Sequence, residues 1–420
     1  MSLLPRKLRR RGLLRLLFVG PDPRPGEARR TLIRTAGQER PARPIRLTIV
    51  QDKLTAGGVE ILLLELCARI DRSLVEPRLI CLKRAGEMGA DFEAAGVPVE
   101  TLGRRGRFDP TTLVRLLRSF RAARTDVVLV THHQRAAMVL GRIAARLARV
   151  PANVVAAHDM DVTRVGDRVL PRGVVETLFL SDALVLLAPS QGRYLHGEEG
   201  VGRFPWRRTR EVVIPNGTEL GTAPTTADRL AARARLGLDP ADLVVGIVAI
   251  FRAQKAHHVL LRAIAQLAPT HPRLRLVAVG HGPEEGRIRA LAEELGITDR
   301  VLFTGLRDDV AEILPGFDVS CLASVHEGAP LAVLESMAAG VPMVATDVGA
   351  LRDLLADSRE GYIVPAGDPE ALADRLAALL ADPVLREEMG RRARARAERE
   401  FSIEHTVQGY QELLVGLVAR

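Results

Sequence analysis

Short apolar, β-branched runs alternate with longer segments of helical periodicity along the chain from Ile45 onward. The runs are apolar on both faces, which is typical of parallel strands buried between two layers of helices. In the first half of the chain the pattern predicts strands at 45–50, 79–82, 127–130, 154–157, 184–187 and 212–216. Helices are predicted between them, among others at 59–70, 112–123 and 135–147.

The segment 217–241 interrupts this alternation with Gly, Thr, Pro and Asp, and we interpret it as a linker with one short helix. The alternation then restarts, with strands predicted at 244–250, 274–280, 301–304, 319–322 and 343–346 and helices at 258–268, 284–295 and 331–339. Three helices are predicted at the end, near 370–381, 384–399 and 403–419, with 391–400 as a charged, solvated face.

Two separate β-α-β runs in 420 residues predict an α/β protein with two Rossmann-like, doubly wound parallel-sheet domains that face each other across a cleft. We expect a first domain at 45–216, a second at 217–400, and a last helix at 401–420 that packs back on the first domain. Residues 1–44 would form a poorly ordered extension. Because ligands bind at the carboxyl ends of the strands in such sheets, the residues that follow each strand are the candidates for function.

The formal net charge of +9 changes this picture only at the N-terminus. Residues 1–44 contain twelve Lys or Arg and three Asp or Glu, so the remaining chain is electrically balanced. A basic groove for nucleic acid is therefore not favoured. The cations are nearly all Arg, and Lys7, Lys53, Lys83 and Lys255 are the four lysines.

The three cysteines are scattered and form no ligand spacing, which indicates a reducing compartment and argues against a structural zinc. No apolar run reaches about 18 residues, and the head lacks the pattern of a signal peptide. We expect a cytoplasmic protein. The basic head would add weak attraction to anionic lipid at the inner face of the membrane. The mixed aromatic and cationic segment 200–210 could touch a lipid-linked acceptor or a membrane surface, and a solvated loop is an equally good interpretation.

The segment from Ser324 to Glu335 holds the most informative chemistry. A loop with Glu327 follows a predicted strand, and Pro330 suits the first turn of a helix that carries Glu335. The N–H groups of that helix start suit an anion such as a diphosphate, and carboxylates accept hydrogen bonds from sugar hydroxyls. A capping Glu with a second Glu in solvent is the simpler interpretation of an isolated pair.

Two cations, Arg252 and Lys255, follow the first strand of the second half and could neutralise a diphosphate, although surface cations are equally common there. Gly57 and Gly58 would let the backbone approach a ligand, or serve the turn alone. His132, His133 and His158 follow two strands of the first half. Each can equally be structural, and the lack of a third ligand at suitable spacing argues against a metal.

Together these features resemble the family-4 retaining glycosyltransferases (group 1), which have the GT-B fold. The resemblance covers roughly residues 45–420. It rests on Gly57-Gly58, Ile214-Pro215-Asn216-Gly217, Gln254-Lys255, Gly305, the Glu327–Glu335 pair with its Gly328-Ala329-Pro330 loop, and Val348-Gly349.

The resemblance implies transfer of a sugar from a nucleotide diphosphate donor to an acceptor, with retention of configuration and without a metal or other cofactor. The acceptor would be lipid-linked or a precursor of a polysaccharide or glycoconjugate, bound by the first domain. The implied catalytic residues are His158, Lys255 and Glu327. The implied donor-binding residues are Gly58, Arg252, Lys255, Glu327, Gly328, Ala329, Pro330, Leu331 and Glu335, with His132 and His133 on the acceptor side.

One position departs from the family pattern, because Ile250 stands where many members have an arginine. Arg252 is our candidate for the replacement. Two alternatives stay open: a nucleotide-sugar epimerase of similar fold, and a non-catalytic module whose head binds an anionic surface.

Overall fold

The computed structural model of the chain describes residues 41–55, 57–106, 109–160, 164–165, 168–169, 175–202 and 209–419. Most of the predicted basic extension, and residues 203–208 of the segment 200–210, lie outside the described residues. Arg43, the last arginine of that extension, is described. It donates two hydrogen bonds to the carboxylate of Asp126, at 2.7 and 2.8 Å.

The first half forms a seven-stranded sheet in the order β3-β2-β1-β4-β5-β8-β9, and every pair is parallel. Its strands are β1 (Ile45–Gln51), β2 (Val75–Cys81), β3 (Val99–Thr101), β4 (Val127–Thr131), β5 (Ala152–Ala156), β8 (Ala183–Leu186) and β9 (Arg210–Val213). The helices between them are α2 (Gly58–Arg69), α3 (Gly89–Ala94), α4 (Thr111–Ala122), α5 (Arg135–Ala148) and α7 (Pro189–Gly197), with the 3₁₀ turn η1 (Thr177–Leu180). Two short strands, β6 (Arg164–Val165) and β7 (Arg168–Val169), form a separate antiparallel pair.

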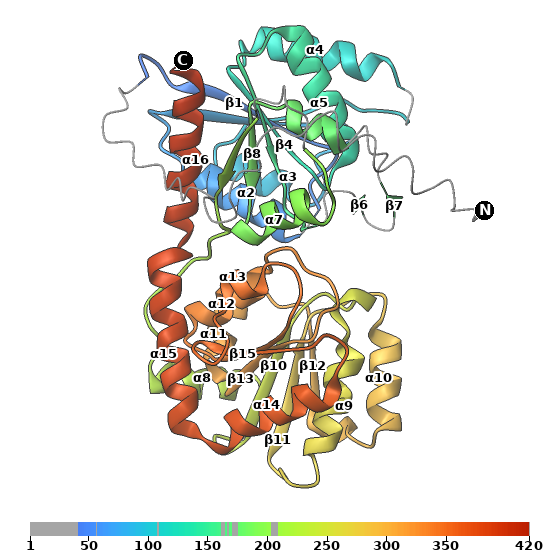
Figure 1. Cartoon of the computed structure of the whole chain (residues 1–420), viewed down its shortest axis with the longest axis vertical. Coiled ribbons are helices and arrows are strands. Elements are labelled where there is room, and N and C mark those ends of the chain that lie inside the picture. Colours follow the sequence, from blue (N-terminus) through green and yellow to red (C-terminus); the bar gives the residue numbers. More distant parts are fainter. Residues whose placement is uncertain are drawn as a thin grey trace, which may run out of the picture. The chain divides into compact units, whose positions relative to one another are not determined.

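The second half forms a six-stranded parallel sheet in the order β12-β11-β10-β13-β14-β15. Its strands are β10 (Leu243–Val248), β11 (Leu274–Val279), β12 (Val301–Gly305), β13 (Val319–Leu322), β14 (Met343–Thr346) and β15 (Gly361–Val364). Figure 1 shows these strands with helices around them. The helical elements are α8 (Thr226–Arg235), η2 (Ala253–Lys255), α9 (His257–Leu267), α10 (Glu285–Glu294), η3 (Thr298–Arg300), α11 (Val310–Ile313), η4 (Leu314–Gly316), α12 (Leu331–Ala338), α13 (Leu351–Leu354) and α14 (Pro369–Ala381).

Alternate residues of one strand serve the two faces of this second sheet. In β10, Val245 and Ile247 join a core with α9 and α14, whereas Val244 joins a second core with η4. The predicted stripe of α9, from Val259 to Leu267, is buried in the first of these cores. Burial on both faces explains why these strands carry apolar residues on both faces and confirms the α/β fold class that the pattern predicts.

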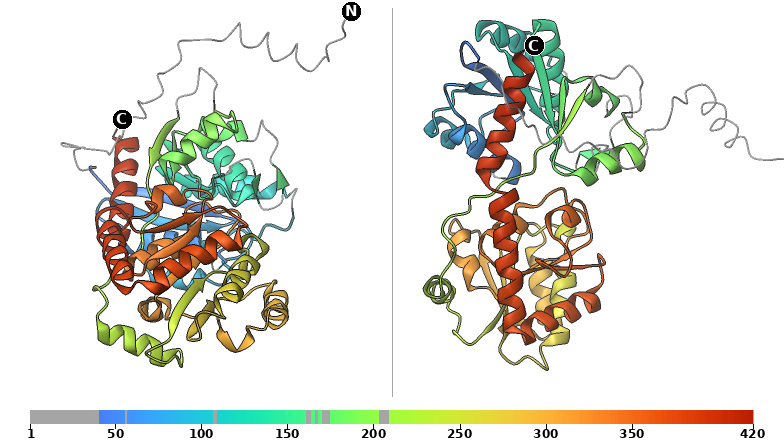
Figure 2. Two further views of the ribbon diagram at one scale, coloured as in Figure 1. Left: turned by 60° about the horizontal axis from the view of Figure 1, so that its bottom comes forward. Right: turned by 60° about the vertical axis from the view of Figure 1, so that its left-hand side comes forward.

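Helices α15 (Pro383–Glu400) and α16 (Ile403–Val418) end the chain, separated by Phe401 and Ser402 (Figure 2). Helix α16 packs on α2 and β1, so the prediction that the last helix returns to the first domain is confirmed. Gln411 of α16 accepts a hydrogen bond from the backbone N–H of Asp71, at 2.7 Å.

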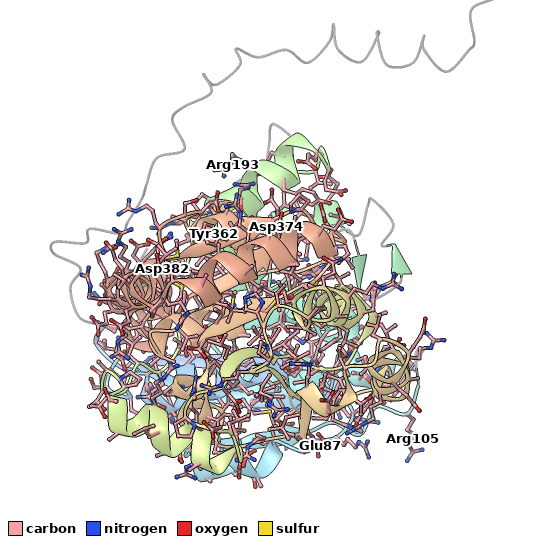
Figure 3. The ribbon with its side chains drawn as sticks, turned by 90° about the horizontal axis from the view of Figure 1, so that it is seen from below. Glu87, Arg105, Arg193, Tyr362, Asp374 and Asp382 are labelled. Atoms are coloured by element: carbon pink, nitrogen blue, oxygen red, sulfur yellow. The ribbon has the colours of Figure 1, made fainter. Side chains whose placement is uncertain are left out.

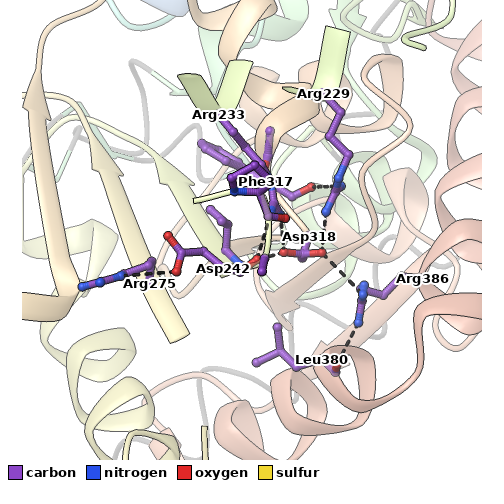
Figure 4. A network of polar contacts seen from close by, with 12 residues as sticks. Arg229, Arg233, Asp242, Arg275, Phe317, Asp318, Leu380 and Arg386 are labelled. Carbon is purple, nitrogen blue, oxygen red and sulfur yellow. Dashed lines mark hydrogen bonds and ion pairs between the residues drawn. The ribbon is translucent and has the colours of Figure 1, made fainter. Parts of the chain in front are cut away.

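A buried carboxylate joins three elements of the second half (Figure 4). Asp318, which precedes β13, forms ion pairs with Arg233 and Arg229 of α8, both at 2.7 Å, and with Arg386 of α15 at 3.5 Å. Its carboxylate also accepts a hydrogen bond from the backbone N–H of Val244 at the start of β10. Arg233 is 2% exposed, so this carboxylate compensates a cation that the fold removes from water.

Two expectations about elements were incomplete. The pattern did not predict α3, β3, α7 or β15, which are short or lie at a sheet edge. The prediction of a solvated face at 391–400 was wrong for Arg394 and Arg396 of α15. Their guanidinium groups donate hydrogen bonds to backbone carbonyls, those of Leu220, Ala338 and Asp353. Their long stems let charged groups reach backbone acceptors beneath the helix.

Candidate active site

Two loops at the carboxyl end of the second sheet are joined by a backbone hydrogen bond. The N–H of Val325, in the loop after β13, donates to the carbonyl of Gln254 in η2, at 2.8 Å. This contact places Lys255 beside Glu327, and the Lys255 Nζ donates to the Glu327 Oε1 at 2.6 Å. The sequence had selected both residues, but their pairing follows only from the fold.

The Glu327 side chain is 6% exposed and is held by neighbouring loops. Ser324 donates its hydroxyl to the same carboxylate oxygen, at 2.5 Å, and Thr346 at the end of β14 fixes the carbonyl of Ser324. Gly349 passes directly over the backbone, since a Cβ at this position would lie 2.2 Å from the Glu327 carbonyl oxygen. Its φ of +60° also suits glycine, which explains the Val348-Gly349 signal in the sequence.

Helix α12 begins in the same loop and leaves its first backbone N–H groups without a side-chain cap. Pro330 is the N-cap, and Asn216 of the connecting segment donates to the carbonyl of Ala329, at 3.0 Å. Uncapped N–H groups at a helix start, next to a lysine, form a site that favours an anion. Glu335 lies further along α12, half-buried, and burial raises the pKa of its carboxyl.

His158 follows β5 of the first sheet and lies against this loop. Its carbonyl oxygen is 2.8 Å from the place that a Cβ on Gly328 would occupy. Neither ring nitrogen of His158 has a hydrogen-bond partner within the described ranges. Burial, with a smaller contribution from the charges of His133 and His132, lowers the pKa of this imidazole to about 3, so it is neutral at pH 7.

A pocket of about 340 Å³ opens beside these groups. His326 lines this pocket, and its Nε2 lies 2.9 Å from the Asp159 Oδ1. Arg193 of α7 stands at the outer border of the molecule in Figure 3. The lining comprises Met160, Ser190, Arg193, Tyr194, Glu198, His326, Glu327 and Gly349.

The other predicted residues of the first domain lie at the ends of β1 and β4. The Nε2 of His133 is 3.1 Å from the Glu60 Oε1, and Gln134 donates to the same oxygen at 2.9 Å. Burial acts to raise the pKa of Glu60, but the hydrogen bond and charge of His133 outweigh it and the net direction is down. His132 is buried, and Gly58 begins α2 at a point where a Cβ would lie 3.4 Å from the Leu331 side chain.

Arg252 precedes η2, and its carbonyl accepts a hydrogen bond from the N–H of Lys255 at 3.0 Å. Its side chain is exposed and lines a hollow of about 200 Å³ together with His258 and Arg287, whereas Lys255 and Glu327 are not among the residues that line it. Arg252 as the replacement for the arginine missing at Ile250 therefore stays a prediction.

Sequence reasoning missed several residues that hold the site. Ser324, Gln254 and Thr346 position Glu327 or Lys255, and the Asp159–His326 pair lies beside His158 and Glu327. The only local signal was the Ser-x-x-Glu spacing of Ser324 and Glu327. Among the residues that the structure describes, no group of three or more His, Cys, Asp or Glu could hold a metal ion. In the same part of the chain, every helix is too short or too polar to cross a bilayer.

The two parallel-sheet α/β halves have the architecture of the GT-B class, and comparison with known proteins gives the family. The model of the glycosyl transferase 4-like domain matches residues 57–217, and that of the glycosyl transferases group 1 matches residues 228–396. The chain therefore belongs to the group 1 glycosyltransferases with a family-4-like first domain.

Three curated relatives show the extent of the likeness. The N-acetyl-alpha-D-glucosaminyl L-malate synthase of Bacillus anthracis is 34% identical over 44% of this chain and 49% of its own length. The D-inositol 3-phosphate glycosyltransferase of Segniliparus rotundus is 36% identical over 47% and 45%. The putative glycosyltransferase EpsF of Bacillus subtilis is 29% identical over 72% and 79%. The chain thus spans about half the length of the first two relatives.

Solved structures share the fold at low identity. Anabaena HepE in complex with UDP superimposes with a TM-score of 0.75 at 21% identity, covering 89% of this chain and 100% of that one. The lipopolysaccharide glycosyltransferase WaaG gives a TM-score of 0.69 at 17% identity, covering 88% and 100%. At these identities the likeness shows the fold.

Proposed function

We propose that the protein is a retaining glycosyltransferase that moves a sugar from a nucleotide diphosphate-sugar to an acceptor hydroxyl without a metal ion. The observation that carries this proposal is the Lys255–Glu327 pair at the uncapped start of α12, against the partnerless imidazole of His158. Family membership supports the same reaction class.

The diphosphate of the donor would occupy the α12 start. Lys255 is in reach of this position and is neutralised by Glu327 in the ligand-free protein. When the donor binds, the ammonium group exchanges this partner for phosphate oxygens, and the amides from Gly328 to Leu331 add their partial positive charge. The arrangement supplies charge neutralisation to the leaving group, which supports a metal-independent mechanism.

The three remaining side chains suit the sugar and the nucleoside. Glu327, released from Lys255, accepts hydrogen bonds from hydroxyls of the transferred sugar, and Glu335 accepts them from the ribose. His158 hydrogen-bonds a sugar hydroxyl through ring nitrogens that otherwise lack partners. With a pKa of about 3 it is a poor base at neutral pH.

The transfer step breaks one bond and forms one bond at the anomeric carbon, and it needs no side chain as a base. The bond between the anomeric carbon and the diphosphate oxygen breaks, and its electron pair leaves with the diphosphate. The acceptor oxygen bonds to the anomeric carbon, and its proton passes to the departing diphosphate. Attack from the leaving-group side gives retention, the outcome that the group 1 resemblance implies.

A nucleotide-sugar panel tests this proposal. We expect one nucleotide sugar to raise the melting temperature and to be hydrolysed slowly without acceptor, because a bound ligand stabilises the folded state. Glu335→Ala should weaken its binding by about tenfold, since a charged acceptor of ribose hydroxyls is lost. If no nucleotide sugar binds or is hydrolysed, the proposal is wrong, and conversion of the donor to an isomer without nucleotide release would establish an epimerase.

Two measurements test the finer claims. The anomeric configuration of the product, read by proton NMR, should equal that of the donor. Activity should survive EDTA, because Lys255 and the α12 start neutralise the diphosphate. An inverted product, or activity that returns only with added divalent cation, would refute retention or metal independence respectively.

We also propose peripheral binding to anionic membranes, through α4 and α5. Residues 110–151 contain eight arginines and one acidic residue, Asp126, which is bonded to Arg43 and Arg46. Arg118, Arg121, Arg146 and neighbouring arginines are exposed together with Val114, Ile143 and Leu147, the last at 52% exposure. Arg121 of α4 donates to the carbonyl of Leu147 in α5, so the two helices share one surface (Figure 1). Cations mixed with apolar side chains suit an anionic lipid surface.

Flotation with phosphatidylcholine vesicles, with and without phosphatidylglycerol, tests this surface. We expect binding only with the anionic lipid, lost at high salt and in the triple variant Arg118→Glu, Arg121→Glu, Arg146→Glu. The matched control replaces the exposed arginines Arg262, Arg287 and Arg391 with Glu. Equal loss in both triple variants would show a net-charge effect and no specific surface.

A further inference from the structure

All three lysines after the N-terminal extension follow parallel strands at their carboxyl ends. Lys53 comes two residues after β1, Lys83 two residues after β2, and Lys255 lies in the loop after β10. In a chain with 56 arginines this placement is selective. Lys255 is taken up by the proposed donor site, whereas Lys53 and Lys83 have no role in it.

Backbone hydrogen bonds hold the ends of β1, β2 and β3 side by side. The N–H of Lys83 donates to the carbonyl of Asp52 at 3.0 Å, and the N–H of Arg104 donates to the carbonyl of Leu82 at 2.7 Å. Lys53, Lys83 and Arg104 therefore come from three neighbouring strands at one edge of the first sheet.

The charge at this edge is unbalanced. The loops 52–54, 83–87 and 103–106 carry five cationic side chains and two acidic ones, Asp52 and Glu87. Lys53 and Lys83 are exposed, and neither forms an ion pair with an acidic side chain in the described ranges. Arg105 projects away from the body at the border of the molecule where Glu87 also lies (Figure 3).

Asp52 is the acidic residue near Lys83 and Arg104, and its single carboxylate cannot neutralise both cations. One of its carboxylate oxygens is buried without a hydrogen-bond partner. Burial raises the pKa of this carboxyl, while the charges of Arg104 and Lys83 oppose the rise, which shows that both cations lie close to it. A bound anion would pair with the exposed ammonium groups of Lys53 and Lys83, which form no ion pair with an acidic side chain in the described ranges.

The lysine-bearing strand ends lie at the same carboxyl end of the sheet as His158 of the proposed reaction centre. His158 follows β5, which is two strands from β1 and three from β2. Strands lie about 4.8 Å apart, so the two lysine-bearing strand ends are about 10 and 14 Å from that of His158. The lysine side chains reach part of the way toward His158. The distance that remains between an ammonium group and His158 fits one pyranose ring, with its reacting hydroxyl at one end and an anionic substituent at the other.

We infer that Lys53, Lys83 and Arg104 form a subsite for the phosphate group of a phosphorylated glycosyl acceptor, whose free hydroxyl reaches His158. The inference rests on the proposed glycosyl transfer and adds the class of its acceptor. Compact ammonium groups at the ends of neighbouring strands suit a phosphate or diphosphate, which offers oxygens in several directions. The phosphate belongs to a soluble sugar phosphate or to a lipid-linked sugar.

Calorimetry with inorganic pyrophosphate tests the subsite directly. The donor site is first saturated with the nucleoside diphosphate that stabilises the protein most, so that pyrophosphate reports the second site alone. Wild-type protein should bind pyrophosphate, and Lys53→Ala/Lys83→Ala should bind it at least about tenfold more weakly. Lys255→Ala should lose nucleoside diphosphate affinity and retain the pyrophosphate site, and Arg287→Ala is the matched control.

Kinetics with paired acceptors give a second readout. Glucose 6-phosphate and N-acetylglucosamine 1-phosphate are compared with the unphosphorylated sugars. Lys53→Ala/Lys83→Ala should lower the preference for the phosphorylated members through KM, and Lys53→Ala/Lys83→Arg should keep part of it. A wild type that binds the nucleoside diphosphate but no pyrophosphate would overturn this inference alone. A wild type that binds neither would overturn the proposed function as well.

Vesicles identify the source of the phosphate. Phosphatidylcholine vesicles that contain undecaprenyl phosphate are compared with phosphatidylcholine alone, for the wild type and for Lys53→Ala/Lys83→Ala. If the wild type binds the vesicles with undecaprenyl phosphate and the double variant does not, the acceptor is lipid-linked. Pyrophosphate binding without vesicle retention indicates a soluble one, and both results support the subsite.

Discussion

At the scale of single residues, the Lys255–Glu327 pair separates stability from catalysis. Both side chains are largely withdrawn from water, at 17% and 6% exposure, so removing one partner leaves a charge without compensation. Lys255→Met should lower the free energy of unfolding by about 3 kcal/mol and abolish transfer. Lys255→Met/Glu327→Gln should regain most of that stability and stay inactive. Recovery of activity in the double variant would show that the pair is only structural.

A second residue-scale prediction concerns Asp318. Its carboxylate compensates Arg233, which is almost fully buried, and also binds Arg229 and Arg386. Asp318→Ala should cost about 3–5 kcal/mol in denaturant unfolding. Asp318→Asn, which keeps the shape but not the charge, should cost nearly as much. A loss below about 1 kcal/mol would indicate that water replaces the carboxylate at Arg233.

At the scale of elements, the loop that leads into α12 must pass close to β5. A Cβ on Gly328 would lie 2.8 Å from the His158 carbonyl oxygen and 3.2 Å from the Asp159 Cα. Gly328→Ala must displace backbone, so we expect kcat/KM to fall by about 100-fold. The same displacement should lower the free energy of unfolding by about 1–3 kcal/mol. Gly286→Ala in α10, where a Cβ meets no atom within 4 Å, is the matched control. Equal activities of the two variants would contradict the close approach.

Elements also show where sequence patterns lose their information. Strands β13 and β14 match their predicted bounds, because their short buried runs end at polar or glycine-bearing loops. Strand β3 has three half-buried or exposed residues at a sheet edge, so no apolar run marks it. Arg394 and Arg396 of α15 look solvated in sequence, since the carbonyls that they bind lie on other elements.

At the scale of the whole molecule, two buried imidazoles make the free energy of unfolding depend on pH below neutrality. The pKa of His158 is about 3 and that of His257 about 4, mainly because burial disfavours the charged form, whereas the unfolded chain has values near 6.5. The unfolded state therefore binds more protons below pH 6.5. The stabilisation is complete above that pH and is lost as the pH falls toward 4 and 3.

The melting temperature measured between pH 7 and 4 tests this dependence. It should fall steadily below about pH 6.5, and His257→Leu should flatten the decline, because one titrating group is removed. Above pH 6.5 the melting temperature of the variant should change with pH as that of the wild type does. An unchanged acid slope would mean that carboxylates, and not His257, dominate the acid response.

The sequence alone determined the two parallel sheets and the residue types of the site. Runs with apolar residues on both faces require burial on both sides of the sheet. Glu327, Lys255, His158 and the glycines follow strands whose carboxyl ends collect ligands. Tertiary structure alone decided which of them meet. The bond between Lys255 and Glu327 joins residues 72 positions apart, and the Gly328–His158 approach joins two sheets. Such contacts depend on loop geometry between distant strands, which no local pattern encodes, and the same loops expose Lys53 and Lys83 beside Asp52.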